Sequence, residues 1–214
     1  MNPHLRRFVR TFLALLGLLL LSQLLLRLFL QLRRTPIPPR FGFLLRSRLR
    51  RSYRSPAETL APLSIQPGMT VLEVGPGTGL FTLEAARQVG PNGKLICIDL
   101  QPTFTEQTST VVEEAGVRHV ELHVADVVAM PLPPGSVDRA FLVAVLPEVP
   151  DVMAALMSLQ RVLRPGGLLL ISEEVIAPEY VPPAVTRRWA ARAGFELVSE
   201  SGNFFCYSQV YRNP

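Results

Sequence analysis

The sequence has few of the residues that hold small secreted or metal-binding proteins together. Only two of its 214 residues are cysteine, Cys97 and Cys206, and they lie far apart in the chain. Disulfide frameworks and zinc sites need closely spaced cysteines, so both classes are excluded. The three histidines are not spaced along the chain with the cysteines as the ligands of a metal site would be. We therefore expect no metal site and a domain that works with reduced thiols.

Acidic residues are absent from the first quarter of the chain. Residues 1–54 contain twelve arginines, no lysine and no acidic residue. Residues 55–214 have ten basic and seventeen acidic residues, a net charge of −7, so the total of +5 comes from the N-terminal segment. Because that basic segment adjoins a hydrophobic run, it gives no reason to expect nucleic-acid binding.

Charged residues are also missing from Thr11 to Leu26, a stretch made mostly of leucine. Arg27 ends this stretch, and apolar residues resume after it. A helix crosses a bilayer with about 20 residues, and an arginine near its end can extend its side chain to the headgroups. We therefore predict a membrane-anchor helix. A cleaved secretory signal and a soluble amphipathic or oligomerising helix are the alternatives.

These features predict three segments. Residues 1–34 form the anchor helix with its basic flanks, residues 35–59 a basic linker containing prolines, and residues 60–214 the folded domain. More arginines follow the apolar run than precede it, and the positive-inside rule then places the folded domain in the cytoplasm. The same arginines either attract anionic lipid headgroups, at ~1 kcal/mol each, or serve only to set this orientation.

Apolar segments alternate with helical ones after the linker, which is typical of βαβ units and a parallel sheet. The expected strands are residues 70–74, 94–98, 120–124, 138–145, 168–172, 195–199 and 205–212, and the expected helices are residues 80–89, 103–115, 151–163 and 184–193. The link between the last two strands is too short for a crossover, so they form an antiparallel hairpin. The predicted fold class is α/β, a doubly wound, mostly parallel seven-stranded sheet with a C-terminal antiparallel hairpin, preceded by an N-terminal hydrophobic helix.

The most informative motif joins the first strand to its helix. Residues 71–79 read Val-Leu-Glu-Val-Gly-Pro-Gly-Thr-Gly. Glycine lets the main chain turn with positive φ and lets a ligand approach it closely, and the first turn of the next helix leaves N–H groups unpaired. The dinucleotide fingerprint G-x-G-x-x-G is missing because Leu80 occupies its third glycine position. This disfavours a nicotinamide-dependent enzyme.

Acidic residues stand at the carboxyl ends of neighbouring strands. Asp99 follows the second strand and Asp126 the third, while Glu73 lies in the first beneath the glycine turn. Ligands of doubly wound sheets bind at this edge. A carboxylate at position 99 can accept two hydrogen bonds from a ribose diol, and one at position 126 can reach the exocyclic amine of an adenine. Each acid alone is equally well explained as a helix cap or a solvated strand end, but together around a glycine loop they indicate a nucleoside site.

Further motifs follow the glycine loop. They are Ala125-Asp126 with Met130-Pro131-Leu132, Ser136-Val137-Asp138, and Arg161-Val162-Leu163-Arg164-Pro165-Gly166-Gly167 before a strand. With residues 71–79 and Asp99, they make the domain resemble the class I S-adenosyl-L-methionine (SAM)-dependent methyltransferases. The resemblance extends from about residue 60 to residue 212 and is greatest to the small single-domain group similar to the ubiquinone/menaquinone-biosynthesis methyltransferases.

The resemblance implies SAM as the cofactor and methyl donor, and it implies where SAM binds. The residues that would enclose its methionine part are Gly75, Pro76, Gly77, Thr78 and Gly79, with Glu73 beneath them. Asp99 would bind the ribose with Leu100 beside the adenine, and Asp126 and Val127 would lie at the adenine edge.

The acceptor side departs from the family. Many relatives carry a histidine after the fourth strand, where this chain has Pro147. The sequences Asn-Pro-Pro-Tyr and Asp-Pro-Pro-Tyr are also missing there, which argues against methylation of nucleobase or glutamine amino groups. No catalytic residue is assigned. Candidate bases are Glu148, Glu173 and Glu174, and candidate pocket walls are Tyr53, Tyr180 and Trp189, although each is also explained as a surface or packing residue.

We predict a SAM-dependent methyltransferase that transfers a methyl group to a small, lipophilic acceptor at the membrane surface. The lipophilic acceptor is expected because the domain follows a membrane anchor. The alternative is a non-catalytic, membrane-tethered SAM-binding or scaffold protein, which the missing histidine favours and the intact glycine loop disfavours. Neither the methylated atom nor the oligomeric state follows from the sequence.

Overall fold

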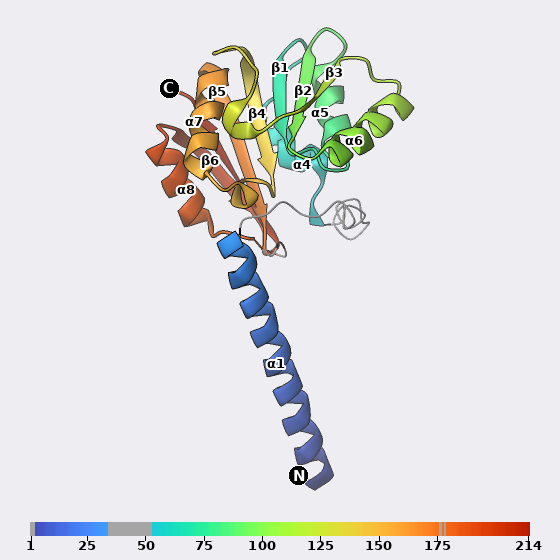
Figure 1. The fold of residues 1–214 in the computed structure, drawn as a ribbon, viewed down its shortest axis with the longest axis vertical. Coiled ribbons are helices and arrows are strands. Elements are labelled where there is room, and N and C mark those ends of the chain that lie inside the picture. Colours follow the sequence, from blue (N-terminus) through green and yellow to red (C-terminus); the bar gives the residue numbers. More distant parts are fainter. Residues whose placement is uncertain (1–2, 34–52, 176, 178) are drawn as a thin grey trace.

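The computed structural model describes residues 3–33, 53–175, 177 and 179–214, and Figure 1 shows how they are arranged. The N-terminal part is one helix, α1 (Pro3–Arg33). Large apolar side chains are exposed along it, among them Phe12, Leu15 and Leu18. The predicted N-terminal hydrophobic helix is therefore present.

Among the described residues, no helix combines the length and the hydropathy needed to cross a membrane. The prediction of a membrane-spanning anchor over residues 1–34 is therefore not supported.

The folded part contains one seven-stranded sheet, with the strand order β3-β2-β1-β4-β5-β7-β6. The strands are β1 (Thr70–Val74), β2 (Lys94–Asp99), β3 (Val120–Val124), β4 (Val137–Val143), β5 (Leu163–Glu174), β6 (Glu196–Gly202) and β7 (Cys206–Arg212). The first five run parallel, and β7 pairs antiparallel with both β5 and β6. The predicted mostly parallel sheet with a C-terminal antiparallel hairpin is confirmed.

Helices cover both faces of this sheet (Figure 1). They are α4 (Pro56–Leu60), η2 (Ala61–Leu63), α5 (Thr82–Val89), α6 (Pro102–Glu114), η3 (Val127–Ala129), η4 (Leu146–Glu148), α7 (Val152–Val162) and α8 (Pro183–Arg192). Local signals set several ends. Asp151 caps α7 by accepting a hydrogen bond from the Ala154 N–H at 2.9 Å, and Gly90, with φ +68°, ends α5.

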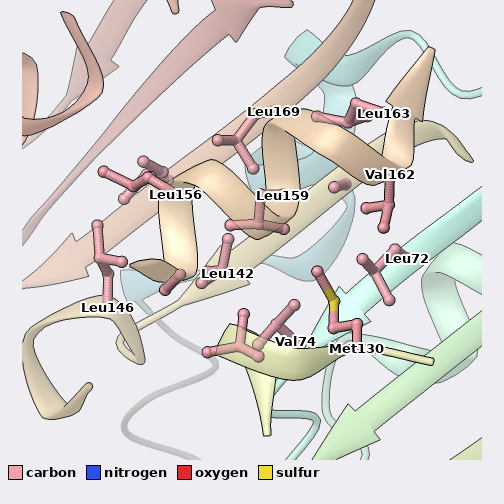
Figure 2. Close-up of a cluster of buried hydrophobic side chains, with 14 of the residues drawn as sticks. Leu72, Val74, Met130, Leu142, Leu146, Leu156, Leu159, Val162, Leu163 and Leu169 are labelled. Atoms are coloured by element: carbon pink, nitrogen blue, oxygen red, sulfur yellow. The ribbon is translucent and has the colours of Figure 1, made fainter. Parts of the chain in front are cut away.

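Alternating residues of the strands supply two hydrophobic cores. Leu72 and Leu142 pack with α7 on one face of the sheet, where Figure 2 shows Leu142 beside Leu159 and Leu72 beside Val162. Val71 and Phe141 pack on the other face with α5 and with the segment before β1. Because both faces are buried, the glycine loop and the acids at the strand ends are held on a rigid edge.

The segment before β1 is part of the folded domain. Most of the predicted linker, residues 35–59, lies outside the described residues, but its described end contains the buried side chains of Arg54 and Thr59. Ser55 begins α4 by accepting a hydrogen bond from the Glu58 N–H. The chain therefore already packs against the domain at Arg54.

The largest difference from the expected strand boundaries lies at the Arg-Pro-Gly-Gly sequence before β5, which is not a free turn. Leu163 pairs with Val137 in β4. The Gly166 N–H donates to the Asn213 carbonyl at 2.8 Å, and the Asn213 N–H donates to the Gly167 carbonyl at 2.9 Å. A partner about 50 residues away thus extends β5 through Gly167, a long-range effect that local sequence does not reveal.

Candidate cofactor and acceptor site

The glycine loop between β1 and α5 has the backbone that only glycine adopts readily. Gly75, Gly77 and Gly79 have φ of +69°, +58° and +76°. The Gly75 N–H donates to the Ile98 carbonyl at 2.8 Å, which joins the loop to the end of β2. A Cβ at Gly75 would lie 2.5 Å from Cγ2 of Val145. The loop therefore turns tightly between the ends of β2 and β4.

The side chains of the loop pack into the domain. Pro76 and Thr78 are buried, and Thr108 of α6 donates its hydroxyl to the Gly77 carbonyl at 3.1 Å. Phe81, at the N-terminus of α5, makes no side-chain capping hydrogen bond. A ligand over this loop would consequently meet main-chain groups, including the N–H groups of the first turn of α5.

Glu73 faces the protein interior, beneath the loop. Its Oε2 accepts hydrogen bonds from the Thr82 hydroxyl at 2.7 Å and from the Cys97 thiol at 3.4 Å. Burial raises the pKa of Glu73 to about 7, although these two hydrogen bonds lower it. Glu73 therefore ties β1 to α5 and β2, and its direct contribution to cofactor binding stays a prediction.

Asp99 lies at the carboxyl end of β2, beside the glycine loop. Its Oδ1 accepts the Gln101 N–H at 2.9 Å. Burial raises the pKa of Asp99, and hydrogen bonds from the main chain of Gln101 and Gly77 lower it. The carboxylate is thus fixed against the loop. The side chain of Leu100, the next residue, is 53% exposed. This exposure agrees with the prediction that Leu100 packs against the face of the adenine.

Asp126 and Val127 follow β3 and are oriented differently. Asp126 is exposed and caps η3, where its Oδ1 accepts the Val128 N–H at 3.0 Å. Val127 is buried in the core beside α7, so only its main chain can meet an adenine. The structure brings Asp126 to the same edge of the sheet as Asp99, because Asp99 pairs with Val124 of β3.

The chemistry of this edge fits SAM. Three glycines with positive φ form the turn at the end of β1, and a partly buried carboxylate stands at the end of the neighbouring β2. The order β3-β2-β1-β4-β5 places Asp99 and Asp126, the acids predicted to bind adenosine, on one side of the glycine loop and the ends of β4 and β5 on the other. A cofactor whose adenosine lies over β2 and β3 would point its sulfonium end toward β4 and β5.

A buried polar cluster lies at those ends of β4 and β5. Nη1 of Arg54 lies 2.7 Å from Oε1 of Glu174, and its Nη2 donates to the hydroxyl of Ser172. The Tyr53 hydroxyl donates to Oε2 of Glu174 at 3.1 Å. Glu173 is 1% exposed, and its Oε1 has no hydrogen-bond partner. Oε2 of Glu179 is likewise buried and unpartnered.

Sequence reasoning found only part of this cluster. Glu173, Glu174, Tyr53 and Tyr180 were among the candidates, and Tyr180 contacts the Tyr207 ring edge-on. Trp189, a residue of α8, instead packs against the hydrophobic core. Arg54 and Glu179 were missed, because one belongs to an arginine-rich stretch and the other to a loop without a motif. Among the described residues, no group of side chains could hold a metal ion.

Comparison with known proteins identifies the type of domain. Residues 72–171 match the family described as "Methyltransferase domain". An uncharacterized 37.1 kDa protein in transposon TN4556 of Streptomyces fradiae is 41% identical over 125 residues, which are 58% of this chain and 34% of that protein. A demethylmenaquinone methyltransferase of Listeria welshimeri is 33% identical over 112 residues, 52% of this chain and 48% of that protein. The chain thus spans about a third to a half of these relatives' length.

The fold also matches solved structures. The crystal structure of a SAM-dependent methyltransferase from Aquifex aeolicus superposes with a TM-score of 0.79 at 23% identity, covering 84% of this chain and 100% of that one. At this identity the likeness concerns the fold. The matched family and the named relatives therefore identify residues 72–171 as a methyltransferase domain, and the strand order and the solved structure show that it has the fold of the class I SAM-dependent methyltransferases.

Proposed function

We propose that this chain transfers the methyl group of SAM to a small, lipophilic acceptor at the cytoplasmic surface of a membrane. The observation that carries the proposal is the sheet edge itself, where the glycine loop of β1 and Asp99 of β2 lie on one side and the buried cluster of β5 on the other. One edge thus offers a cofactor site and an adjoining acceptor site.

The protein's part in such a reaction is positioning. SAM supplies an electrophilic methyl group on a good leaving group, and an in-line approach of the acceptor then lowers the barrier by several kcal/mol. The loop around Gly77 and the carboxylate of Asp99 would hold the donor. The ends of β4 and β5 would hold the acceptor, because β4 lies between β1 and β5.

Two observations support a lipophilic acceptor and a membrane surface. The Listeria welshimeri relative is named for its action on demethylmenaquinone, a quinone. Helix α1 exposes many apolar side chains, and residues 1–54 carry twelve arginines without an acid. An apolar helix with arginines on both sides would associate with a membrane and hold its arginines near anionic lipids, so that the domain meets its acceptor there.

Two measurements on the full chain test the donor and the acceptor. Calorimetry should show SAM binding, and isotope-labelled SAM incubated with a membrane extract should label an extractable lipophilic product. Asp99→Ala is the matched control and should lose both signals together. If SAM binds but no label passes to a membrane or water-soluble acceptor, the protein is a SAM-binding scaffold and the proposal of catalysis is wrong.

The membrane surface is tested separately by co-sedimentation with lipid vesicles. The full chain should bind vesicles that contain anionic lipid and lose this binding as salt rises, since the arginine contribution is electrostatic. A variant with Arg6, Arg7 and Arg10 replaced by glutamine should bind more weakly. Equal binding to neutral vesicles at all salt concentrations would contradict the arginine part of the proposal.

A further inference from the structure

Glu173 is the most unusual side chain on the acceptor side of the sheet. It lies near the end of β5 and is 1% exposed. Its neighbours along the strand have partners. The Ser172 hydroxyl bonds to the Tyr207 carbonyl at 2.7 Å, and Glu174 pairs with Arg54. Oε1 of Glu173 has none. A buried carboxyl oxygen without a donor costs stability, so its presence needs a reason other than folding.

The surroundings of Glu173 hold little net charge. The charged and titratable groups that influence it or are influenced by it are Arg54, Glu148, Glu174, Glu179, Tyr180 and Tyr207. Arg54 and Glu174 neutralise each other at 2.7 Å. Burial raises the pKa of Glu179 and raises that of Glu173 well above its usual value, while Arg54 lowers the latter. With Arg54 engaged by Glu174, the site offers no positive charge to hold an anionic acceptor group, so an uncharged hydroxyl suits it better than an anion.

The position of Glu173 relates it to the cofactor site. Ser172, the preceding residue, pairs with Val143 of β4, and its carbonyl accepts the Ala144 N–H at 2.8 Å. The residue after Ala144 is Val145, which precedes η4 and has its side chain next to Gly75, close enough to overlap a Cβ there. Glu173 is therefore two strands from the glycine loop, or roughly 10 Å at the ordinary strand spacing. This is the side toward which the sulfonium of a bound SAM would point.

We propose that Oε1 of Glu173 is the proton acceptor for a hydroxyl group of the methyl acceptor, which makes the substrate class a weakly acidic hydroxyl compound such as a phenol or a reduced quinone. This inference rests on the proposed methyl transfer. A hydroxyl donating to Oε1 would supply the missing hydrogen bond, and it would bring the acceptor to the end of β5. Glu179, with its own unpartnered oxygen, borders the same site.

The step balances as follows. The O–H bond of the acceptor breaks and its proton moves to Oε1 of Glu173. The electron pair left on oxygen forms the new bond to the methyl carbon, while the carbon–sulfur bond breaks and its electron pair stays on sulfur. The products are a methyl ether and S-adenosylhomocysteine, and the proton on Glu173 returns to solvent. If a ring carbon conjugated with the oxygen attacks instead, its own hydrogen is lost afterwards as a proton.

The test compares Glu173→Gln with the wild-type full chain. Glutamine keeps the volume and cannot accept the proton. With labelled SAM and 1-naphthol as the acceptor probe, kcat should fall by about 10²- to 10⁴-fold, the usual effect of losing a general base, whereas the Kd for SAM should stay within about threefold. Glu196→Gln, an exposed residue of β6, is the matched control and should keep wild-type activity.

Two readouts separate proton transfer from a structural role. The wild-type rate should rise with pH as Glu173 loses its proton, and this rise should be absent in Glu173→Gln. A nitro-substituted naphthol, whose hydroxyl is more acidic, should suffer a smaller loss of rate in the variant than 1-naphthol does. The melting temperature of the variant should equal or exceed that of the wild type, because the substitution removes a buried carboxyl group without a donor.

The results distinguish failure of the role of Glu173, of the hydroxyl substrate class and of the proposed methyl transfer. Equal rates for Glu173→Gln and wild type, or a variant that loses SAM binding and stability together, would overturn the role of Glu173 while methyl transfer stands. Methylation of 1-naphthylamine but not of 1-naphthol would overturn the hydroxyl substrate class. SAM binding without methylation of either probe or of a membrane extract would overturn the proposed function itself.

Discussion

The two halves of the sheet edge are built in different ways. On the side of β1, β2 and β3 the structure relies on main chain, with three glycines of positive φ and acids fixed by backbone N–H groups. On the side of β4 and β5 it relies on buried side chains, with Arg54 and Glu174 paired and Glu173 unpartnered. A backbone site binds one constant donor, whereas side chains can be exchanged to suit a particular acceptor. The four predictions below test this contrast.

The largest effect is expected at Arg54. Arg54→Met removes one member of a buried ion pair and leaves Glu174 without its charge partner, which costs about 3–5 kcal/mol. The free energy of unfolding from urea titration measures this loss. The double variant Arg54→Met/Glu174→Gln should recover part of it. If the single variant were as stable as the wild type, the side-chain half of the edge would not depend on this pair.

The backbone half is tested at Gly75. Gly75→Ala places a Cβ 2.5 Å from Cγ2 of Val145 at a φ of +69°, and strain and overlap together cost about 2–5 kcal/mol. We expect SAM affinity by calorimetry to fall at least tenfold. Val145→Ala in the same chain removes the overlap but not the backbone strain, so it should rescue part of the affinity. Wild-type SAM affinity in Gly75→Ala would show that the tight turn is not required.

Glu73, beneath the glycine loop of the backbone half, makes the stability of the protein depend on pH. Its pKa of about 7 in the folded protein exceeds the ordinary 4.5 because of burial, so the folded state holds a proton that the unfolded chain releases. The contribution of Glu73 to the free energy of unfolding is then fully present below pH 4.5. It is lost as the pH rises to about 7, a decrease of about 3 kcal/mol. Glu73→Gln lacks this decrease. Unfolding curves at pH 5 and pH 8 should therefore favour the variant more at pH 8, and parallel curves would contradict the assignment. SAM affinity of the same variant tests whether Glu73 contributes to the cofactor site.

The smallest effects are expected on SAM affinity when Asp99 and Asp126 are replaced one at a time. Asp99→Asn should weaken SAM binding by about 1.5–3 kcal/mol, the value of hydrogen bonds to a charged group. Asp126→Asn should weaken it less, because Asp126 is exposed. Calorimetry gives both values, and thermal unfolding shows whether loss of the η3 cap contributes. A larger effect at Asp126 would mean that the adenine contact, not the ribose contact, dominates donor binding.

The sequence predicted the backbone half well because its signals are local. Strands β1 and β3 lie at the expected residues 70–74 and 120–124. The glycines at 75, 77 and 79 by themselves predict a turn with positive φ. The side-chain half was predicted poorly because its contacts are distant in the chain. Arg54 and Ser172 are 118 residues apart, and no local pattern shows that an arginine from a basic stretch is buried. The same reason explains why β5 begins earlier than expected, where Asn213 holds Gly166 and Gly167.

The membrane-spanning helix is a prediction from local composition alone. Residues 11–32 resemble a span in sequence, but among the described residues no helix combines the length and the hydropathy to cross a membrane. The arginine-rich segment contacts the folded domain where it ends, at Arg54. The side chain of Arg54 is 0% exposed, so a stretch whose sequence resembles a linker ends among the buried side chains next to β5.

The position of β7 within the sheet has a consequence for biosynthesis. Residues 206–212 follow every other strand of this sheet in the chain, yet they lie between β5 and β6 and bury Gln209 and Tyr211. While the ribosome is still making these residues, β5 has an open edge, and an open edge can pair with other chains. The sheet is completed only after residue 212 has been made.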